Sequence, residues 1–171
     1  LKQEEILQFL KKVSLFKNIS EAGIRPALDF IEIGKYQKGE NIIREGEKGD
    51  SLFFLFEGQV SVSKKMTLLS SRIEMGQLDK ALIKLKDSDH AFFGEMAICG
   101  EGEVRSATVT AETDCILGEL SAETIHRMTE KNYDFGLNFY RNLSGILADR
   151  LRKANRDILK LTTALTLALE E

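Results

Sequence analysis

The chain has 171 residues, of which 43% are hydrophobic and 30% charged, with a formal net charge of −3. This composition is typical of a globular protein that is long enough for one domain with a full core. The small negative charge gives no general attraction for nucleic acid or an anionic membrane. No apolar run approaches the roughly 20 residues that are needed to span a bilayer.

The first 30 residues are expected to be helical. A helical apolar face recurs through the first 13 residues, and Ser20 with Glu21 is typical of a helix cap and first turn. Pro26 would break a continuous helix, so a short turn and a new helix are expected near it. The apolar positions of the first face are Ile6, Leu7, Phe9, Leu10 and Val13.

From Ile33 the pattern changes to short β-type runs punctuated by glycines, which predicts a barrel or sandwich. The run Leu52–Phe56 is apolar on both faces, as in a central strand. Later strands are expected at 81–86, 107–111 and 115–120. Ser121 then predicts the N-cap of a helix that ends near Lys131.

The segment from Met66 to Gln77 has an exposed-looking Leu68-Leu69 pair and a turn-like Ser70-Ser71 step. Its length exceeds that of an ordinary hairpin connection, so a protruding loop is expected. A partner-binding site is the alternative, and nothing in the sequence decides between the two.

The last element is expected to be one long helix from about 135 to 169. Its apolar residues alternate four and three apart, which is a heptad seam. Such a helix is about 50 Å long, further than a small barrel covers, so a homodimer through the seam is expected. The basic run near Arg150 is interrupted by Asp149 and Asp157, which indicates a solvated flank. The seam residues are Leu147, Leu151, Ala154, Ile158, Leu161, Leu165 and Ala168.

The two cysteines, Cys99 and Cys115, form neither a CxxC pair nor a disulfide framework. Both stand among apolar residues, so buried free thiols in a reducing compartment are expected, which favours a cytoplasmic location. His90 and His126 are too isolated to form a metal cluster with them. No Walker, GxSxG or HExxH motif occurs, so the chain is expected to be no enzyme and to hold no cofactor or metal.

The stretch from Phe92 to Thr110 reads FFGEMAICGEGEVRSATVT and has the chemistry of an anion-binding loop. Gly94 tolerates positive φ and lets the backbone approach a ligand closely. Arg105 can clamp a phosphate with two charge-assisted hydrogen bonds, and the adjacent Ser106 hydroxyl can donate to it. Glu95 is then free to accept from a hydroxyl such as that of a ribose.

This stretch resembles the phosphate-binding cassette of the cyclic nucleotide-binding domain family, which includes bacterial catabolite activator proteins and the regulatory subunits of cyclic-AMP-dependent protein kinase. Phe-Gly-Glu at 93–95 and Arg-Ser-Ala-Thr at 105–108 fill the pattern in order, and a second signature lies at 46–58. The resemblance implies a mainly β fold, a β-roll of jelly-roll type flanked by N-terminal helices and the long C-terminal helix. It divides the chain into a binding domain at 1–134 and a dimerisation or lid helix at 135–171.

The resemblance also implies a role for each site residue. Glu95 would accept the ribose 2′-hydroxyl and Arg105 would hold the cyclic phosphate. The ligand would be cyclic AMP, with cyclic GMP possible, because selectivity for cyclic GMP in the family often goes with Thr after the arginine. The anion cradle would be completed by Gly94, the backbone amides around Met96 and Ala97, and Ser106, while Asn155 would face the base from the long helix.

The sequence departs from the family pattern at two places. Relatives often have Gly-Asp where this chain has His90-Ala91, and Pro where it has Val104. Neither change removes a phosphate ligand, but both bear on the rigidity of the loop. The expected function is non-catalytic binding of a cyclic nucleotide, coupled to helix position in a dimer.

Two alternatives to this function stay open. One is a structural dimerisation module with a vestigial pocket, against which the presence of both Glu95 and Arg105 argues. The other is the truncated sensor half of a DNA-binding regulator. Because the chain stops at Glu171, no DNA-binding helix-turn-helix domain is expected after the long helix.

Overall fold

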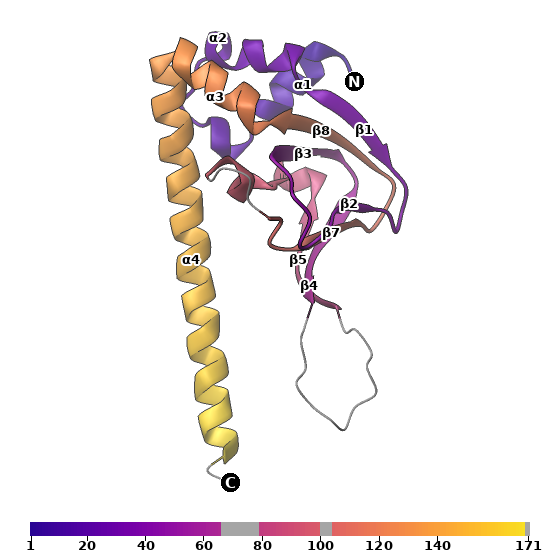
Figure 1. Cartoon of the computed structure of the whole chain (residues 1–171), viewed down its shortest axis with the longest axis vertical. Helices are drawn as coiled ribbons and strands as arrows, with labels where there is room; N and C mark the ends of the chain where they lie inside the picture. The colour runs from indigo at the N-terminus through magenta and orange to yellow at the C-terminus, as the bar shows by residue number, and fades with distance from the viewer. Residues whose placement is uncertain (66–78, 100–103, 170–171) are drawn as a thin grey trace.

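A β-roll with helices at one end forms the body of the protein, and one long helix runs beside it (Figure 1). The computed structural model describes residues 1–65, 79–99 and 104–169. The expected loop at 66–77 therefore lies outside the described residues. Among the described residues, no helix combines the length and the apolarity needed to cross a membrane.

The N-terminal segments are helical, as predicted, and cap one end of the roll. The Ser20 hydroxyl accepts from the amide of Gly23 at 3.2 Å, which confirms the predicted cap. Pro26 stands in the first turn of a new 3₁₀ helix, where its missing N–H costs no hydrogen bond. The elements are α1 (Gln3–Leu10), η1 (Ser14–Phe16), α2 (Glu21–Ile24) and η2 (Arg25–Asp29).

Two four-stranded antiparallel sheets build the roll, with orders β1-β8-β3-β6 and β2-β7-β4-β5. β3 lies between β8 and β6 and is buried along most of its length, which confirms the predicted central strand. β5 begins at Asp79, two residues before the predicted position. The strands are β1 (Glu32–Tyr36), β2 (Asn41–Ile43), β3 (Ser51–Glu57), β4 (Gln59–Lys65), β5 (Asp79–Lys86), β6 (Phe92–Phe93), β7 (Thr108–Ala111) and β8 (Cys115–Ser121).

Two apolar clusters form the core. One lies inside the roll between the two sheets, around Leu55 and Leu117. The other joins the N-terminal helices to β3 and to the start of the long helix, around Phe16, Phe54 and Phe139. The second cluster therefore fixes the root of the long helix against the roll.

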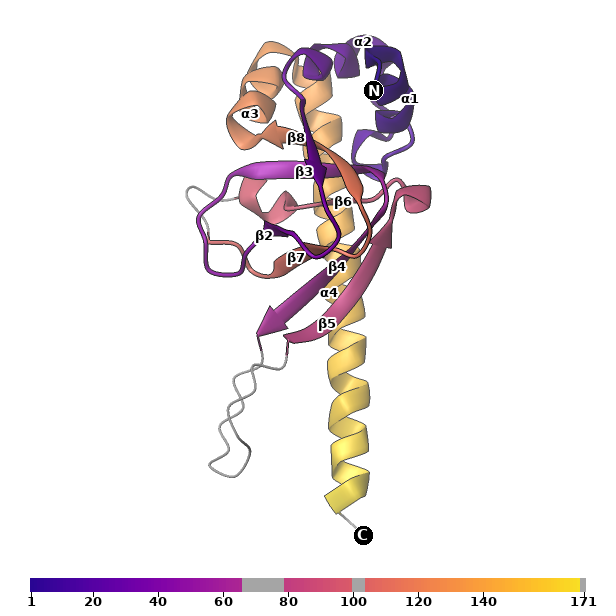
Figure 2. The ribbon, with the colours of Figure 1, turned by 90° about the vertical axis from the view of Figure 1, so that its right-hand side faces the viewer.

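Two helices follow β8. Ser121 caps α3 (Ala122–Lys131) by accepting from the amide of Thr124 at 3.2 Å, as predicted. Asn132 has extended backbone and ends α3, and its side chain accepts from the amide of Phe135 at 3.0 Å. The chain then continues directly into α4 (Tyr133–Leu169), which begins at the helical end and extends well past the roll (Figures 1 and 2).

Most of α4 does not pack on the roll. Its buried residues, Phe135, Gly136, Phe139 and Leu143, all belong to its first third. Seam residues further along are open to solvent, with Leu151 63% and Ile158 60% exposed. A single chain leaves the leucines and the isoleucine of the seam from Leu151 onward uncovered.

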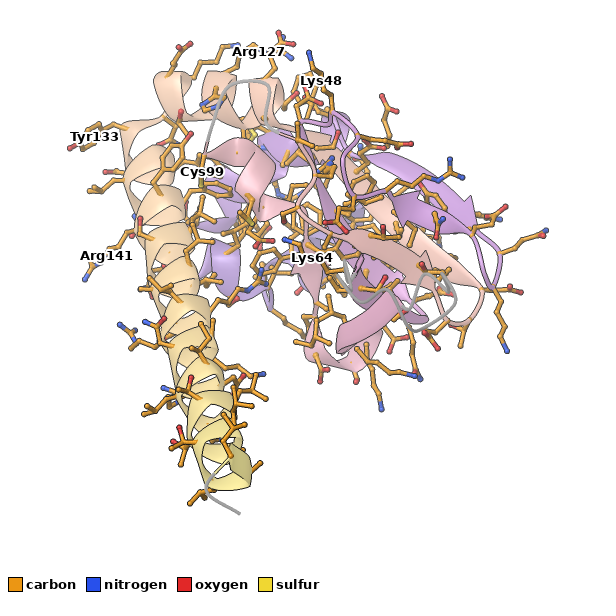
Figure 3. All side chains as sticks on the ribbon, turned by 60° about the horizontal axis from the view of Figure 1, so that its bottom comes forward. Lys48, Lys64, Cys99, Arg127, Tyr133 and Arg141 are labelled. Carbon is orange, nitrogen blue, oxygen red and sulfur yellow. The ribbon has the colours of Figure 1, made fainter. Side chains whose placement is uncertain are left out.

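The prediction for the cysteines is half wrong. Cys115 is buried in the core of the roll, but Cys99 is exposed at the end of a short 3₁₀ turn (Figure 3). The apolar sequence around Cys99 reflects Ile98, which is 2% exposed and takes the core position beside it.

Candidate functional site

The predicted anion loop turns sharply between β6 and the 3₁₀ helix η4 (Glu95–Ile98). Gly94 makes this turn with φ of +83°, in the left-handed region that glycine favours. A Cβ at Gly94 would lie 2.7 Å from the carbonyl oxygen of Ser51 and 2.9 Å from Nη1 of Arg105. Only glycine therefore lets β3, the turn and the arginine come together.

The backbone of Arg105 is held by the upstream glycine-rich segment. Its amide donates to the carbonyl of Glu47 at 2.8 Å, and its carbonyl accepts from the amide of Gly46 at 3.0 Å. The two sequence signatures, at 46–58 and 93–108, are thus joined by backbone hydrogen bonds and lie side by side.

The guanidinium of Arg105 lies on the floor of the site. Nη1 donates to the carbonyl of Ser51 at 2.9 Å and to that of Gly94 at 3.5 Å, and the group lies 5.8 Å from the ring centre of Phe53. Burial lowers the pKa of Arg105 from its ordinary value, and nearby carboxylates oppose this shift. The guanidinium stays charged at neutral pH, because the pKa of an arginine lies far above neutrality.

Gly49 provides the space in which Arg105 lies. A Cβ at Gly49 would come within 2.4 Å of Nε of Arg105. The bare backbone of Gly49 therefore forms one wall of the guanidinium site.

Glu95 is almost completely buried, with 5% of its surface exposed. An unpaired carboxylate at such a place would be strongly destabilising. Arg150 of α4 reaches across and donates from Nη1 to the Glu95 carboxylate. The guanidinium of Arg150 also lies 5.6 Å from the ring centre of Phe92, a cation–π contact. The turn and the long helix are thus joined by an ion pair.

These groups line one cavity of about 510 Å³ between the roll and α4. Arg105 and Ser106 lie at its polar side, while Val62, Ile83 and Leu85 provide an apolar wall from β4 and β5. A volume of this size is typical of a site for a small molecule. An anion with an attached flat apolar ring matches this division of the lining.

Five of the seven predicted site residues meet at this cavity: Gly94, Glu95, Met96, Arg105 and Ser106. The Ser106 hydroxyl donates to the sulfur of Met96 at 3.4 Å. The side chain of Ala97 is not among the described ones. Asn155 is exposed on α4 and does not line the cavity, whereas its neighbour Ala154 does.

The two departures from the family pattern have local explanations. His90 has φ of +48°, the left-handed conformation that glycine would adopt at that place without strain. Val104 is 54% exposed and pairs with Lys48 in an isolated bridge beside Arg105. Val104 lines the cavity with an apolar side chain, whereas His90 does not line it.

Sequence reasoning missed several lining residues, above all Arg150. It was expected on a solvated flank, but it pairs with a buried carboxylate. No local sequence signal pointed to Arg150, because the need for a cation follows from the burial of Glu95, which only the structure shows. Gly49 and Lys64 also line the cavity without having been predicted (Figure 3 shows Lys64).

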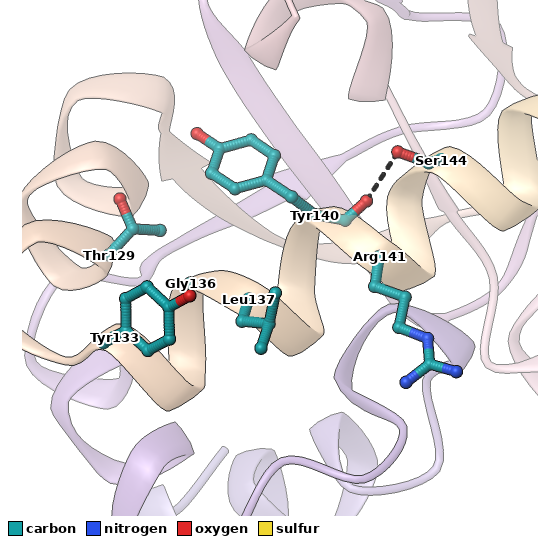
Figure 4. A pocket seen from close by; sticks show the side chains of 7 residues that line it. All are labelled: Thr129, Tyr133, Gly136, Leu137, Tyr140, Arg141 and Ser144. Carbon is teal, nitrogen blue, oxygen red and sulfur yellow. Dashed lines mark hydrogen bonds between the residues drawn. The ribbon is translucent and has the colours of Figure 1, made fainter.

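A second cavity, of about 440 Å³, lies between α3 and α4, away from the loop (Figure 4). In it the Ser144 hydroxyl donates to the carbonyl of Tyr140 at 2.8 Å, and Arg141 is the one charged residue of the lining. Tyr133 and Arg141 point away from the roll (Figure 3). This cavity lacks the buried carboxylate and the clamped arginine that distinguish the first one.

Comparison with known protein families gives a match to the cyclic nucleotide-binding domain over residues 33–132, more than half of the chain. The chain belongs to the cyclic nucleotide-binding domain family. The matched residues include both sequence signatures and end at the α3–α4 junction.

Curated relatives of this cyclic nucleotide-binding domain include cGMP-dependent protein kinase 2 of Mus musculus, 33% identical over 98% of the chain. The chain spans 21% of that kinase. The cAMP-activated global transcriptional regulator CRP of Pasteurella multocida is 30% identical over 77% of the chain, which spans 56% of it.

Solved structures confirm the fold. A cyclic nucleotide-binding domain from Methylobacillus flagellatus superposes with a TM-score of 0.73 at 24% identity, over 92% of this chain and 82% of that one. The Thermus thermophilus catabolite activator protein gives 0.70 at 24% identity, over 87% and 63%. The regulatory domain of Toxoplasma gondii PKA, solved with cAMP, gives 0.67 at 23% identity, over 86% and 50%.

Proposed function

We propose that this domain binds one cyclic purine nucleotide, without catalysis, in the cavity between the roll and α4. The observation that supports this most directly is the convergence of Arg105, Ser106 and Glu95 on one cavity with an apolar wall. In the bound state Arg105 and Ser106 hold the cyclic phosphate, with the backbone amides of Met96 and Ala97 beside them. Glu95 accepts the ribose 2′-hydroxyl, and the base lies against Val62, Ile83 and Leu85.

Arg150 has a part in this site as well. Its ion pair with Glu95 holds the carboxylate in one orientation, and it places a residue of α4 at the ribose end of the cavity. Arg150→Ala is therefore expected to weaken nucleotide binding. A vestigial pocket would not need a buried, paired carboxylate at this place.

The proposed ligand is cyclic AMP in preference to cyclic GMP. Ser106 stands where the family has Thr in many members that select cyclic GMP. Asn155, an exposed residue of α4, stays a predicted partner of the adenine edge.

Calorimetric titration tests this proposal with four ligands: cyclic AMP, cyclic GMP and the linear monophosphate of each. Binding of a cyclic nucleotide, with the linear forms much weaker, is the expected result. Absence of binding by every ligand would overturn the proposed function. Tighter binding of cyclic GMP would show that guanine is the preferred base. Cyclic GMP is included because one of the relatives is a cGMP-dependent protein kinase.

We also propose that the domain forms a homodimer through the α4 seam. Leu151, Ile158 and Leu165 recur seven residues apart and are each at least 60% exposed in the single chain. A parallel coiled coil would bury this seam. Because Arg150 adjoins Leu151, such a dimer would place the partner helix next to the nucleotide site and would couple ligand binding to the position of α4.

A further inference from the structure

Asn142 joins α4 to a segment near the start of the chain. Its side-chain amide donates to the carbonyl of Leu15 at 2.9 Å and to that of Lys17 at 2.7 Å. The Nδ2 atom of Asn142 thus donates one hydrogen to each of two carbonyls at the end of η1. Among the described side chains of α4, that of Asn142 is the one that forms hydrogen bonds to the N-terminal segment.

The two carbonyls flank Phe16, which is 2% exposed. The ring of Phe16 lies 6.0 Å from that of Phe139 on α4 and 5.7 Å from that of Phe54 on β3. Phe54 is the register partner of Phe92, and the Phe92 ring lies under Arg150. The side-chain amide of Asn142 therefore attaches α4 to the group of aromatic side chains around Phe16 and Phe54. Arg150, further along α4, contacts Phe92 of the same group.

The attachment at Asn142 matters because α4 beyond residue 148 is exposed and has few contacts with the roll. From residue 149 to residue 169 every helical position is exposed, and Arg150 with Ala154 provides the contact to the cavity. Arg150 lies eight residues after Asn142, about 12 Å along the axis. A tilt of about 10° at Asn142 would displace Arg150 by about 2 Å, enough to break a charge-assisted hydrogen bond of ordinary length.

We propose that Asn142 is a positioning residue: by clamping α4 to the carbonyls of Leu15 and Lys17, it sets the place of Arg150 over Glu95. Asparagine suits this task because its amide presents two donors on a short planar group. Aspartate would put a carboxylate against two carbonyl oxygens, and leucine would leave both carbonyls without a donor. The proposal deepens the proposed function, since it makes the N-terminal segment part of the control of the nucleotide site.

The first experiment needs no nucleotide. Spin labels are placed at Lys38 and Thr163, both exposed, in a chain that also has Cys99→Ser so that the exposed thiol is not labelled. The labelled chain is diluted in excess unlabelled chain of the same sequence, so that distances within one chain dominate even in a dimer. The distance distribution between the two labels is then measured by pulsed electron resonance for the parent and for Asn142→Leu. We expect the distribution of Asn142→Leu to broaden or shift.

The matched control is Asn138→Leu. Asn138 lies one turn earlier on α4, and its amide donates to the carbonyl of Asp134 within the same helix. The parent distribution is expected for this control. An unchanged distribution for Asn142→Leu would overturn the proposal. If Asn142→Leu does not fold, Asn142→Ser, which keeps one donor, takes its place under the same criteria.

The second experiment is a double-mutant cycle on cyclic AMP and cyclic GMP affinity with Asn142→Leu and Arg150→Ala. We expect Asn142→Leu to weaken binding about fivefold, the effect of losing one net hydrogen bond, and to weaken it no further once Arg150 is absent. Equal losses in both backgrounds would mean a merely structural role and would overturn the proposal. If the parent binds neither nucleotide, the proposed function fails, while the label distances still decide the role of Asn142.

Discussion

At the scale of single residues, the site depends on close approach of backbone and charge. The Arg105 guanidinium contacts two carbonyls and a ring, and no carboxylate of the described residues forms an ion pair with it. Its charge is therefore free to meet an anion. Glu95, by contrast, is already paired with Arg150. The site presents one open cation and one oriented acceptor.

The first prediction concerns this cation. Arg105→Glu is expected to lower nucleotide affinity by at least about two orders of magnitude, because each lost charge-assisted hydrogen bond is worth about 1.5–3 kcal/mol and a like charge replaces it. Calorimetric titration measures the loss, and circular dichroism checks the fold. Arg44→Gln removes an exposed arginine outside the cavity lining and serves as the control. Undiminished binding by Arg105→Glu would exclude the proposed phosphate site.

A second prediction tests the space beside Arg105. Gly49→Ala would place a Cβ 2.4 Å from Nε of Arg105, so the flexible guanidinium must move. We expect affinity to fall about tenfold while the melting temperature changes little, because the displaced group leaves its hydrogen-bonding position. Gly145→Ala is the matched control, since a Cβ there meets nothing within 4 Å. Parent affinity in Gly49→Ala would show that the position of Arg105 does not matter.

At the scale of elements, capping and exposure distinguish the two C-terminal helices. α3 is capped at its N-terminus by Ser121 and packs on the core through Ile125 and Met128. α4 is rooted in the core by its first turns and is open to solvent beyond them. α3 therefore contributes to folding, whereas most of α4 is available for a partner.

The cap of α3 gives a prediction about stability. Ser121→Ala removes the oxygen that accepts from the amide of Thr124. We expect the free energy of unfolding to fall by about 1 kcal/mol, the usual cost of losing such a cap, as measured by urea denaturation. Ser144→Ala, in the interior of α4, is the control and should change stability less. Equal effects of the two substitutions would show that the cap is unimportant.

The seam of α4 gives a prediction about assembly. Leu151→Lys introduces a charge at a core position of the proposed coiled coil and is expected to give a monomer with weakened nucleotide binding. Light scattering measures the assembly and calorimetry the affinity. Leu159→Lys makes the same change at a residue that is 68% exposed but lies off the seam, and it should leave both unchanged. A monomeric Leu151→Lys with parent affinity would show that pocket and dimer are independent.

At the scale of the whole molecule, one cavity lies between two parts that are rooted in a common core. The roll supplies Arg105, Ser106 and Glu95, and α4 supplies Arg150 and Ala154. A ligand that contacts both parts binds one arrangement of them more tightly than any other. Binding and helix position then share one equilibrium, for which coupling is typically about 1–3 kcal/mol.

This coupling predicts a change in hydrogen exchange at two separate places. Cyclic AMP should slow amide exchange in the turn around Glu95 and also in α4 between Leu147 and Ile158. The exchange of both segments is followed by mass spectrometry with and without nucleotide. The segment after Leu161 serves as an internal reference in the Leu151→Lys monomer, where it should not respond. Protection confined to the turn would contradict a role of α4 in the site.

Local patterns were enough to predict much of this protein. The caps at Ser20 and Ser121, the central strand and the long helix follow from residue types and their spacing, because those properties depend on neighbours within a few residues. The family resemblance further pointed to Gly94, Glu95 and Arg105, which the structure brings to one cavity.

The remaining features depend on residues that are far apart in sequence. Arg150 meets Glu95 across 55 positions, and Asn142 meets Leu15 across 127. Cys99 is exposed although its neighbours are apolar, because only the packing of η4 decides which side of the turn faces the core. Periodicity determines which residues share a face of α4, but the direction in which that helix leaves the core determines which of them reaches the site. That direction is set by tertiary contacts between Phe139, Phe16 and Phe54.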